Sequence, residues 1–414
     1  MLIKTKELLS SFLDIKILYN TLFIGIPAFL LITLLVLGFY AEGSQQFSML
    51  ANSFIHGHTY FLSPIGGIGQ DPVLYHGKIY WDDGFFPSII LMPFVFLFNI
   101  FHIFFYQGYI KWIFVLLTAY FIFALAKHFK YSSKDSVILM LGFMLGSVYI
   151  GVNSVSSGWL YAQIICTFLM FWALLEYFKS RNWWLIGGIC GAILLTRIPA
   201  DAILIFFALS ILYTKTSPKT KVWNLFKLGI FVFIAALLLG IYNYQRFNNP
   251  FNNGNYYQLI SASSAQARAM GLLSPNHIPT NLYTLLLRGP LPVLKNSVSW
   301  TLKAPYIKNN NLGMSIFITS PFLLYLFTRK WSSYSRENRL LLLAAFVGAL
   351  ILLCYYGDGA DQFGYRYGLD FLPELFVVFM SIYRKFNKKL SLGMTSLLIL
   401  SGFFNFYLVL SYIT

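Results

Sequence analysis

Long apolar runs separated by short basic breaks dominate the sequence from residue 17 to its end. Several of these runs are long enough to cross roughly 30 Å of hydrocarbon. Because backbone amides find no water inside a bilayer, each crossing segment is expected to be helical. The pattern therefore predicts an all-α, polytopic transmembrane helical bundle of about 11 spans. Residues 1–414 are expected to form a single integral membrane domain.

The basic breaks predict how the spans are oriented. Of the 30 Lys and Arg residues, 20 lie in six short hydrophilic segments, at residues 4–16, 127–134, 179–181, 215–227, 329–339 and 384–389. By the positive-inside rule these segments face the cytoplasm, so the N-terminus lies inside and the C-terminus outside. The apolar stretch 17–40 is too long for a cleaved signal peptide and is expected to be the first span.

Residues 86–126 must make one net crossing, although they are long enough for two. We therefore expect an interfacial helix over 86–105 before a span at 109–126. Residues 41–108 then form a first outer loop and residues 246–312 a second. The remaining spans are expected at 136–153, 158–177, 226–244, 314–328, 340–356, 366–383 and 390–412.

Residues 183–213 are flanked by basic breaks on both sides but are too short to cross twice. Each arm of about 15 residues rises roughly 22 Å. The turn "LLTRIPAD" would hold Arg197 and Asp201 below the outer surface, where a charge is expensive and often functional. The alternative is that Arg197 snorkels to lipid head groups or pairs with Asp201.

The overall charge does not indicate nucleic-acid binding. The chain is 58% hydrophobic and 11% charged, with a net charge of +16. When Asp135 and Glu176, which flank two of the six basic breaks, are counted with them, the rest of the chain holds 10 bases and 9 acids, which nearly cancel, so the excess reflects membrane topology. The cysteines are isolated within apolar runs and predict neither a disulfide framework nor a metal site.

Acids and single arginines gather in the segments expected outside. The first outer loop carries Glu42, Asp71, Asp82 and Asp83 among many aromatic residues. Carboxylates beside aromatic rings suit a general base acting on a hydroxyl-rich substrate. Single arginines follow on three outer elements, at Arg197, Arg246 and Arg366. Guanidinium groups at head-group depth suit a phosphate, so together these residues favour a site for a lipid phosphate and a sugar.

The order of several motifs resembles the GT-C class of membrane glycosyltransferases, in particular bacterial relatives of the protein mannosyltransferases and the aminoarabinose transferase of lipid A. The stretch "AEGSQQFSMLANSFIHGHTYF" (41–61) lies where those families keep an acid and a helix. "DPVLYHGKIYWDDGFFPSIILMP" (71–93) is similar to their D-x-x-x-Y-x-G-x-x-Y and proline motifs. "LLTRIPA", "YNYQRFNNPFNNG" and "FGYRYGLDFLP" resemble their T-R-P, R-F-G-x-P-F and R-Y…L-P stretches.

The resemblance implies inverting transfer of a sugar from a polyprenyl-phosphate carrier to an acceptor outside the plasma (inner) membrane. Asp71 is the first candidate for the base, Glu42 the second, and Asp82 or Asp83 the third. Arg197, Arg366 and Arg246, together with Tyr80 and Tyr365 from the same motifs, would bind the lipid-phosphate donor. Expected partners are this lipid-linked sugar and membrane lipids, with no nucleic acid.

Two other functions and a metal remain open. A polysaccharide polymerase or ligase of the O-antigen type would use the arginines on a diphosphate carrier. A lipid-linked sugar transporter or flippase would place coupling charges near the bilayer midplane. A divalent metal is a further alternative, with His56 and His58 as weak candidates, although imidazoles two residues apart diverge on a helix.

Overall fold

A computed structural model describes residues 16–40, 43–63, 71–296, 300–357, 359 and 361–413. Five helices within this part are long and apolar enough to cross a membrane, at Lys16–Phe39, Gly108–His128, Gly158–Lys179, Pro218–Phe247 and Leu392–Tyr412. They comprise η1 (Thr21–Gly25) with α2 (Ile26–Tyr40), α5 (Gly108–His128), α8 (Gly158–Lys179), α11 (Pro218–Phe247) and α17 (Leu392–Ile413). A mainly helical membrane protein is thus confirmed, whereas the full number of spans stays a prediction.

Three other predicted spans are interrupted. The span at 136–153 is divided into α6 (Ser133–Met144) and α7 (Tyr149–Ser154), and that at 314–328 into α14 (Ile316–Thr319) and a 3-10 segment, η5 (Pro321–Thr328). Asn405 of α17 supports both interruptions, because its amide donates to the carbonyls of Leu145 (3.0 Å) and Thr319 (2.8 Å). The third interrupted span, predicted at 366–383, is divided into η7 (Arg366–Asp370) and α16 (Leu372–Phe386). At the first two interruptions, the buried Asn405 side chain thus satisfies backbone carbonyls that a continuous helix would satisfy itself.

Residues 183–213 form the two short arms expected from their length. Helix α9 (Trp183–Leu194) is followed by the 3-10 segment η2 (Ile198–Ala202) and by α10 (Ile203–Leu212). Arg197 between them has extended backbone angles, and Pro199 lies in the first turn of η2. The proline favours a fresh helical start here because it lacks an N–H to continue α9. Arg197 therefore lies where two short helices meet.

The basic breaks gather at one end of the bundle. Arg384 donates to the Phe129 carbonyl (3.3 Å), and Lys385 donates to that of Ser333 (2.6 Å). Arg336, which begins α15 (Arg336–Leu353), donates to the Tyr213 carbonyl (2.7 Å). The short 3-10 segment η6 (Trp331–Ser333) belongs to the same basic break as Arg336. Four breaks separated in sequence thus share one end, as the positive-inside pattern requires.

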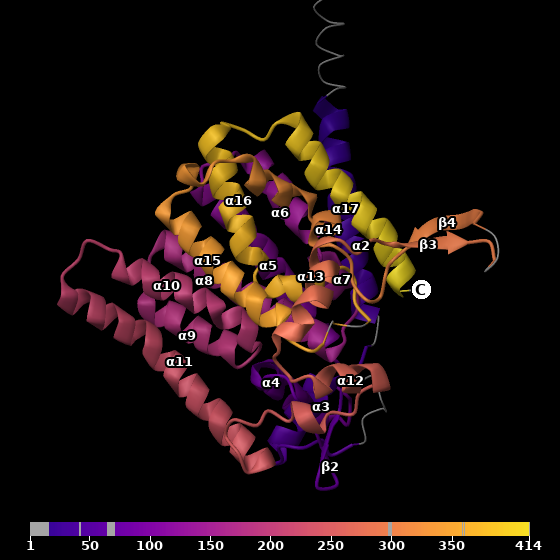
Figure 1. Cartoon of the computed structure of the whole chain (residues 1–414), viewed down its shortest axis with the longest axis vertical. Coiled ribbons are helices and arrows are strands. Elements are labelled where there is room, and N and C mark those ends of the chain that lie inside the picture. The colour runs from indigo at the N-terminus through magenta and orange to yellow at the C-terminus, as the bar shows by residue number, and fades with distance from the viewer. Residues whose placement is uncertain are drawn as a thin grey trace, which may run out of the picture.

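The first outer loop lies at the opposite end, near the lower end of the bundle in Figure 1. It contains α3 (Gln46–Ile55), the paired strands β1 (Val73–Tyr75) and β2 (Lys78–Tyr80), and α4 (Phe86–Ile100). Tyr75 pairs with Lys78 across a two-residue turn in which His76 and Gly77 both have positive φ. Such turns match the twist of the flanking strands. The segment 86–105 contains a helix as expected, α4, which ends at Ile100. Its location at the membrane interface stays a prediction.

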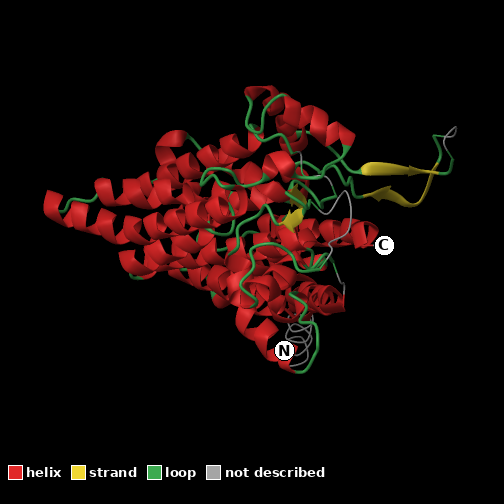
Figure 2. Cartoon of the chain, turned by 90° about the horizontal axis from the view of Figure 1, so that it is seen from below, coloured by secondary structure: helices red, strands yellow, loops and turns green. Residues whose placement is uncertain are grey.

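The second outer loop follows α11. It contains η3 (Asn255–Tyr257), α12 (Ala262–Ala269), η4 (Pro275–His277) and α13 (Ile278–Leu286). The strands β3 (Leu291–Leu294) and β4 (Leu302–Lys308) form a hairpin that stands clear of the helices beside the end of α17 (Figures 1 and 2). The prediction of an all-α fold thus omitted two small hairpins, both in the outer loops where water can solvate sheet edges.

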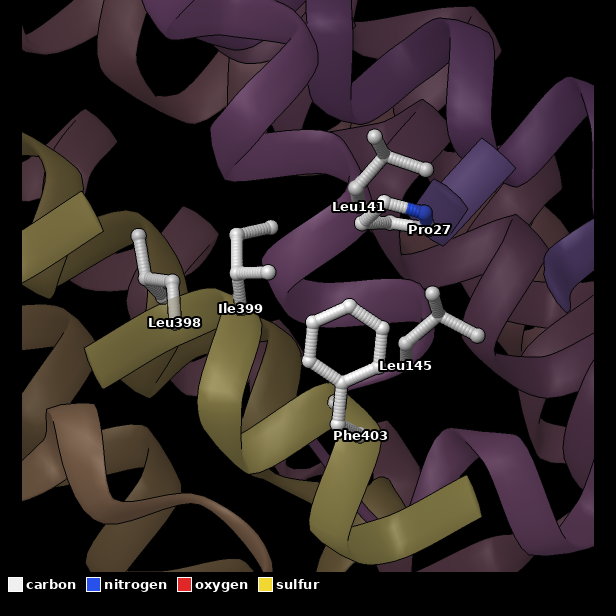
Figure 3. Close-up of a pocket in the computed structure, with 7 residues that line it drawn as sticks. Pro27, Leu141, Leu145, Leu398, Ile399 and Phe403 are labelled. Carbon is white, nitrogen blue, oxygen red and sulfur yellow. The ribbon is translucent and has the colours of Figure 1, made fainter. Parts of the chain in front are cut away.

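A small hollow between α2, α6 and α17 is purely apolar (Figure 3). Its lining consists of Pro27, Leu141, Leu145, Leu398, Ile399, Gly402 and Phe403. No side chain in this lining can donate a proton or hold a charge. The charged residues that suit chemistry lie instead where the outer loops meet the helix ends.

Candidate active site

The turn after β2 is held against the end of α9. The Phe86 amide donates to the Leu195 carbonyl (3.1 Å). Gly84 lies so close to the same carbonyl that an added Cβ would collide with it. This contact brings Asp83, one residue before Gly84, within electrostatic reach of Arg197. The first outer loop is therefore joined to the α9–η2 turn by backbone contacts.

Replacing Gly84 by alanine is expected to displace this turn, because backbone atoms cannot yield as a flexible side chain can. Overpacking of this kind costs about 1–3 kcal/mol. We expect a lower unfolding midpoint and a loss of activity greater than the stability loss explains. Gly188→Ala in α9 is the matched control, since nothing lies within 4 Å of its added Cβ. Equal midpoints and activities for both variants would contradict the close approach at Gly84.

Arg197 is fully engaged by an acid distant in sequence. Its Nε donates to Asp370 Oδ1 and its Nη2 to Asp370 Oδ2, both at 2.7 Å. Both side chains are buried. The observed partner is thus Asp370 rather than Asp201, which was the alternative considered from the sequence. Paired charges at this depth compensate one another, and the pair joins the α9–η2 turn to η7.

Arg366 is also buried, but its guanidinium forms no ion pair with an acid among the described residues. Its backbone is held on both sides, by Gln163 Nε2 donating to its carbonyl and by its own amide donating to Gln362 Oε1, both at 3.0 Å. Its guanidinium lies over the rings of Tyr367 (4.7 Å to the centroid) and Trp159 (6.0 Å). Its Nε and Nη1 have no hydrogen-bond partner among the described residues. A buried guanidinium with unused N–H groups is suited to bind an anion.

Two partly buried carboxylates, Asp71 and Asp83, lie within electrostatic range of this guanidinium. The pKa of Asp71 is raised by burial, against a lowering by Arg366 and with a further rise from Asp83. Burial also raises the pKa of Asp83, opposed by Arg197 and Arg366. Asp71 has a backbone φ of 55°, which is uncommon for a residue other than glycine. A raised pKa suits a general base, because it strengthens the carboxylate as a proton acceptor.

The neighbouring Asp82 is held by the second outer loop. Gln258 Nε2 donates to Asp82 Oδ2 (3.0 Å), and Gln258 Oε1 accepts from the hydroxyl of Tyr356 (2.7 Å). Gln258 also forms a β-bridge with Val73. Burial raises the pKa of Asp82 well above its usual value, and the charges of Asp83 and Asp71 add to the rise. Asp82 is therefore close to the other two acids, but its carboxylate is held by Gln258 and interacts with Arg246 rather than with Arg366.

Other predicted site residues contact the segments that carry the cluster, by which we mean Asp71, Asp82, Asp83, Arg197 and Arg366. Arg246 donates to the Trp81 carbonyl and to Asn243 Oδ1 (2.6 Å), so it holds the backbone that leads to Asp82. Tyr80 is buried with its ring 5.3 Å from that of Phe247. Tyr365 is buried with its ring 6.1 Å from that of Tyr367. Donor binding by Arg246, Tyr80 and Tyr365 stays a prediction.

The metal candidates His56 and His58 make contacts outside the cluster. His56 Nδ1 forms a hydrogen bond with the Asn52 carbonyl (2.8 Å), and His58 lies against the ring of Tyr60. The described residues include no group of three or more His, Cys, Asp or Glu side chains placed to hold a metal ion. Glu42 lies outside the described residues. A divalent metal thus stays a prediction, and no donor set for it is found among the described residues.

Four contributors were not predicted from the sequence, namely Trp159, Gln163, Gln258 and Tyr356. None of the four is charged, and each lies far in sequence from the acids of the first outer loop, so only folding reveals its proximity. Asp370 lies within the segment 366–383 that was expected to be a span, and no pattern in the sequence indicated its pairing with Arg197. The acids Asp71, Asp82 and Asp83 and the arginines Arg197, Arg246 and Arg366 are brought to one region, as their placement in outer segments predicted.

No family model and no curated protein matches the chain. Two solved structures are similar in shape, both of an oligosaccharyltransferase of Archaeoglobus fulgidus. The apo form has a TM-score of 0.41 at 12% identity, covering 94% of this chain and 56% of that one. The AglB complex with an inhibitory peptide and a dolichol-phosphate has a TM-score of 0.42 at 12% identity, covering 93% and 55%. The chain thus spans a little over half of either neighbour, and at these TM-scores neither likeness carries an argument.

Proposed function

We propose that this chain is a membrane glycosyltransferase that moves a sugar from a polyprenyl-phosphate carrier to an acceptor hydroxyl at the outer face of the plasma membrane. The observation that carries the proposal is the presence of Asp71 and Asp83 within electrostatic range of Arg366, whose buried Nε and Nη1 lack partners among the described residues. A proton acceptor thus faces an anion-binding group. Both lie at the helix ends opposite the basic breaks.

In the proposed reaction Asp71 takes the proton from the acceptor hydroxyl as its oxygen attacks the anomeric carbon. A new C–O bond forms while the bond from the anomeric carbon to the phosphate oxygen breaks. That oxygen keeps the electron pair, and polyprenyl phosphate leaves with its charge stabilised by Arg366. Attack opposite the leaving group inverts the anomeric configuration. No nucleotide takes part, because the donor sugar arrives on lipid.

The engagement of each arginine favours a monophosphate carrier. Arg197 makes two hydrogen bonds to Asp370, so its charge is already compensated. Arg246 donates to the Trp81 carbonyl and to Asn243 Oδ1 and lies within electrostatic range of Asp82, which leaves only its Nε without a partner among the described residues, against two such nitrogens in Arg366. This leaves Arg366 as the guanidinium best placed for one phosphate. A polymerase or ligase acting on a diphosphate carrier would be expected to present a second uncompensated cation beside it.

A transporter is the second candidate, and one observation favours it. Both carboxylate oxygens of Glu374 are buried without a partner among the described residues, and so is Oδ1 of Asp201. Buried acids of this kind occur on coupling-ion pathways. Glu374 belongs to α16 and Asp201 to η2, so both lie near the cluster but do not belong to it.

The test is a transfer assay with purified protein in proteoliposomes. Radiolabelled polyprenyl-phosphate hexoses and pentoses are supplied with a detergent extract of the host's cell envelope as acceptor. We expect one donor to lose its label to the acceptor with inverted anomeric configuration and stoichiometric release of polyprenyl phosphate. Movement of labelled lipid between leaflets without release of polyprenyl phosphate would instead indicate a transporter. An Asp71→Asn/Asp83→Asn double variant is the inactive control.

A further inference from the structure

Trp159 lies in the first turn of α8, at the end of this helix where the cluster forms. Its side chain is partly exposed, whereas Gly158 and every residue from 160 to 171 is buried. Trp159 therefore keeps accessible surface at a point where the chain otherwise buries its side chains. A large apolar ring kept partly open beside charged groups is suited to contact a ligand.

The surroundings of this ring place it within the cluster. It stacks on Trp81, with ring centroids 6.4 Å apart and planes at 19°. Trp81 is 1% exposed and directly precedes Asp82 and Asp83. The Arg366 guanidinium carbon lies 6.0 Å from the Trp159 centroid. The Trp159 ring is therefore fixed by the loop that carries the acids and is adjacent to the proposed phosphate-binding arginine.

We propose that Trp159 is the platform on which the apolar face of the donor sugar rests, an inference that depends on the proposed function. In a polyprenyl-phosphate sugar the anomeric carbon is bonded to a phosphate oxygen. A sugar whose phosphate binds Arg366 must therefore lie directly beside that guanidinium, where the Trp159 ring is found. The C–H groups on one face of a sugar ring pack against an indole, which offers a large rigid surface at low entropic cost.

Aromatic residues also anchor membrane proteins at the interface, and Trp159 differs from such an anchor. Its stacking partner is a buried tryptophan, and a buried arginine lies beside its ring. Trp300, by contrast, is 90% exposed beyond β3. Trp300→Ala is therefore the matched control for loss of a tryptophan on the same side of the molecule.

The experiment measures binding of two probes to the full-length protein in nanodiscs, a sugar-free polyprenyl phosphate and the polyprenyl-phosphate sugars of the transfer panel. We expect Trp159→Ala to weaken binding of the preferred sugar-bearing probe about five- to tenfold. Binding of the sugar-free probe should stay within about twofold of the wild type, which also shows that the fold is intact. Trp159→Phe should recover most of the loss, and Trp300→Ala should bind both probes normally.

Other outcomes overturn the platform in distinguishable ways. Unchanged binding of the sugar-bearing probe would show that Trp159 does not touch the sugar. Equal weakening of both probes would assign Trp159 to the prenyl chain or to folding. Wild-type protein that binds the sugar-free lipid with no gain from any sugar would remove the platform but leave the phosphate site. Wild-type protein that binds neither probe would remove the proposed function and the platform with it.

Discussion

Asp71→Asn is expected to lower kcat by about two to four orders of magnitude, the usual contribution of a positioned general base. Asparagine keeps the shape of the side chain but cannot accept the acceptor's proton. Donor binding should be unchanged or slightly tighter, because a negative charge near Arg366 is removed. A fall in kcat without a loss of donor affinity separates this result from misfolding. Single-turnover transfer and equilibrium donor binding on the same preparation measure the two quantities.

The neighbouring acids supply the controls for this experiment. Asp82→Asn should cost less than about tenfold in kcat, because Asp82 accepts a hydrogen bond from Gln258 and is not directed at Arg366. Asp83→Asn should lower the pKa of Asp71 by removing a nearby charge. Wild-type turnover in Asp71→Asn, with a large loss in Asp83→Asn or in Glu42→Gln, would assign the base to that other residue.

Arg366→Gln is expected to weaken donor binding by about one to two orders of magnitude, the range for a lost hydrogen bond to a charged group. It should also change the pH dependence. Burial raises the pKa of Asp71, and Arg366 opposes that rise, so removing the arginine lets the pKa rise further. The base must be ionised to act. Since kcat/KM falls as pH falls through this pKa, its acid limb should move to higher pH in the variant.

A charge-matched control is Arg288→Gln. Arg288 donates to the Leu312 carbonyl and does not belong to the cluster. It should leave donor affinity and the pH profile as in the wild type, which excludes a general effect of removing an outer positive charge. Unchanged donor affinity together with an unshifted acid limb in Arg366→Gln would contradict both roles assigned to this arginine.

Arg197 and Arg366 are the same residue type, but among the described residues the fold gives only Arg197 an acidic partner. Both are buried arginines on outer elements. Arg197 is joined to Asp370 across 173 positions of sequence, and that pairing uses the guanidinium face that would otherwise hold a phosphate. Arg366 has its backbone anchored and its side-chain N–H groups left over. Compensation of charge by a distant partner therefore decides which arginine can bind an anion.

The sequence by itself determined the helical membrane class, the common end of the basic breaks, the broken segment 183–213 and the gathering of acids and arginines opposite the breaks. These properties depend on local hydrophobicity, local charge and segment length, because each segment exchanges water for lipid largely independently of the others. Only the tertiary structure decided that three further spans are interrupted, that Asp370 pairs with Arg197, and that Gln258 and Trp159 join the acids. Those features arise from contacts between side chains far apart in the chain, where packing and hydrogen-bond satisfaction select the partner, and no local pattern carries that information.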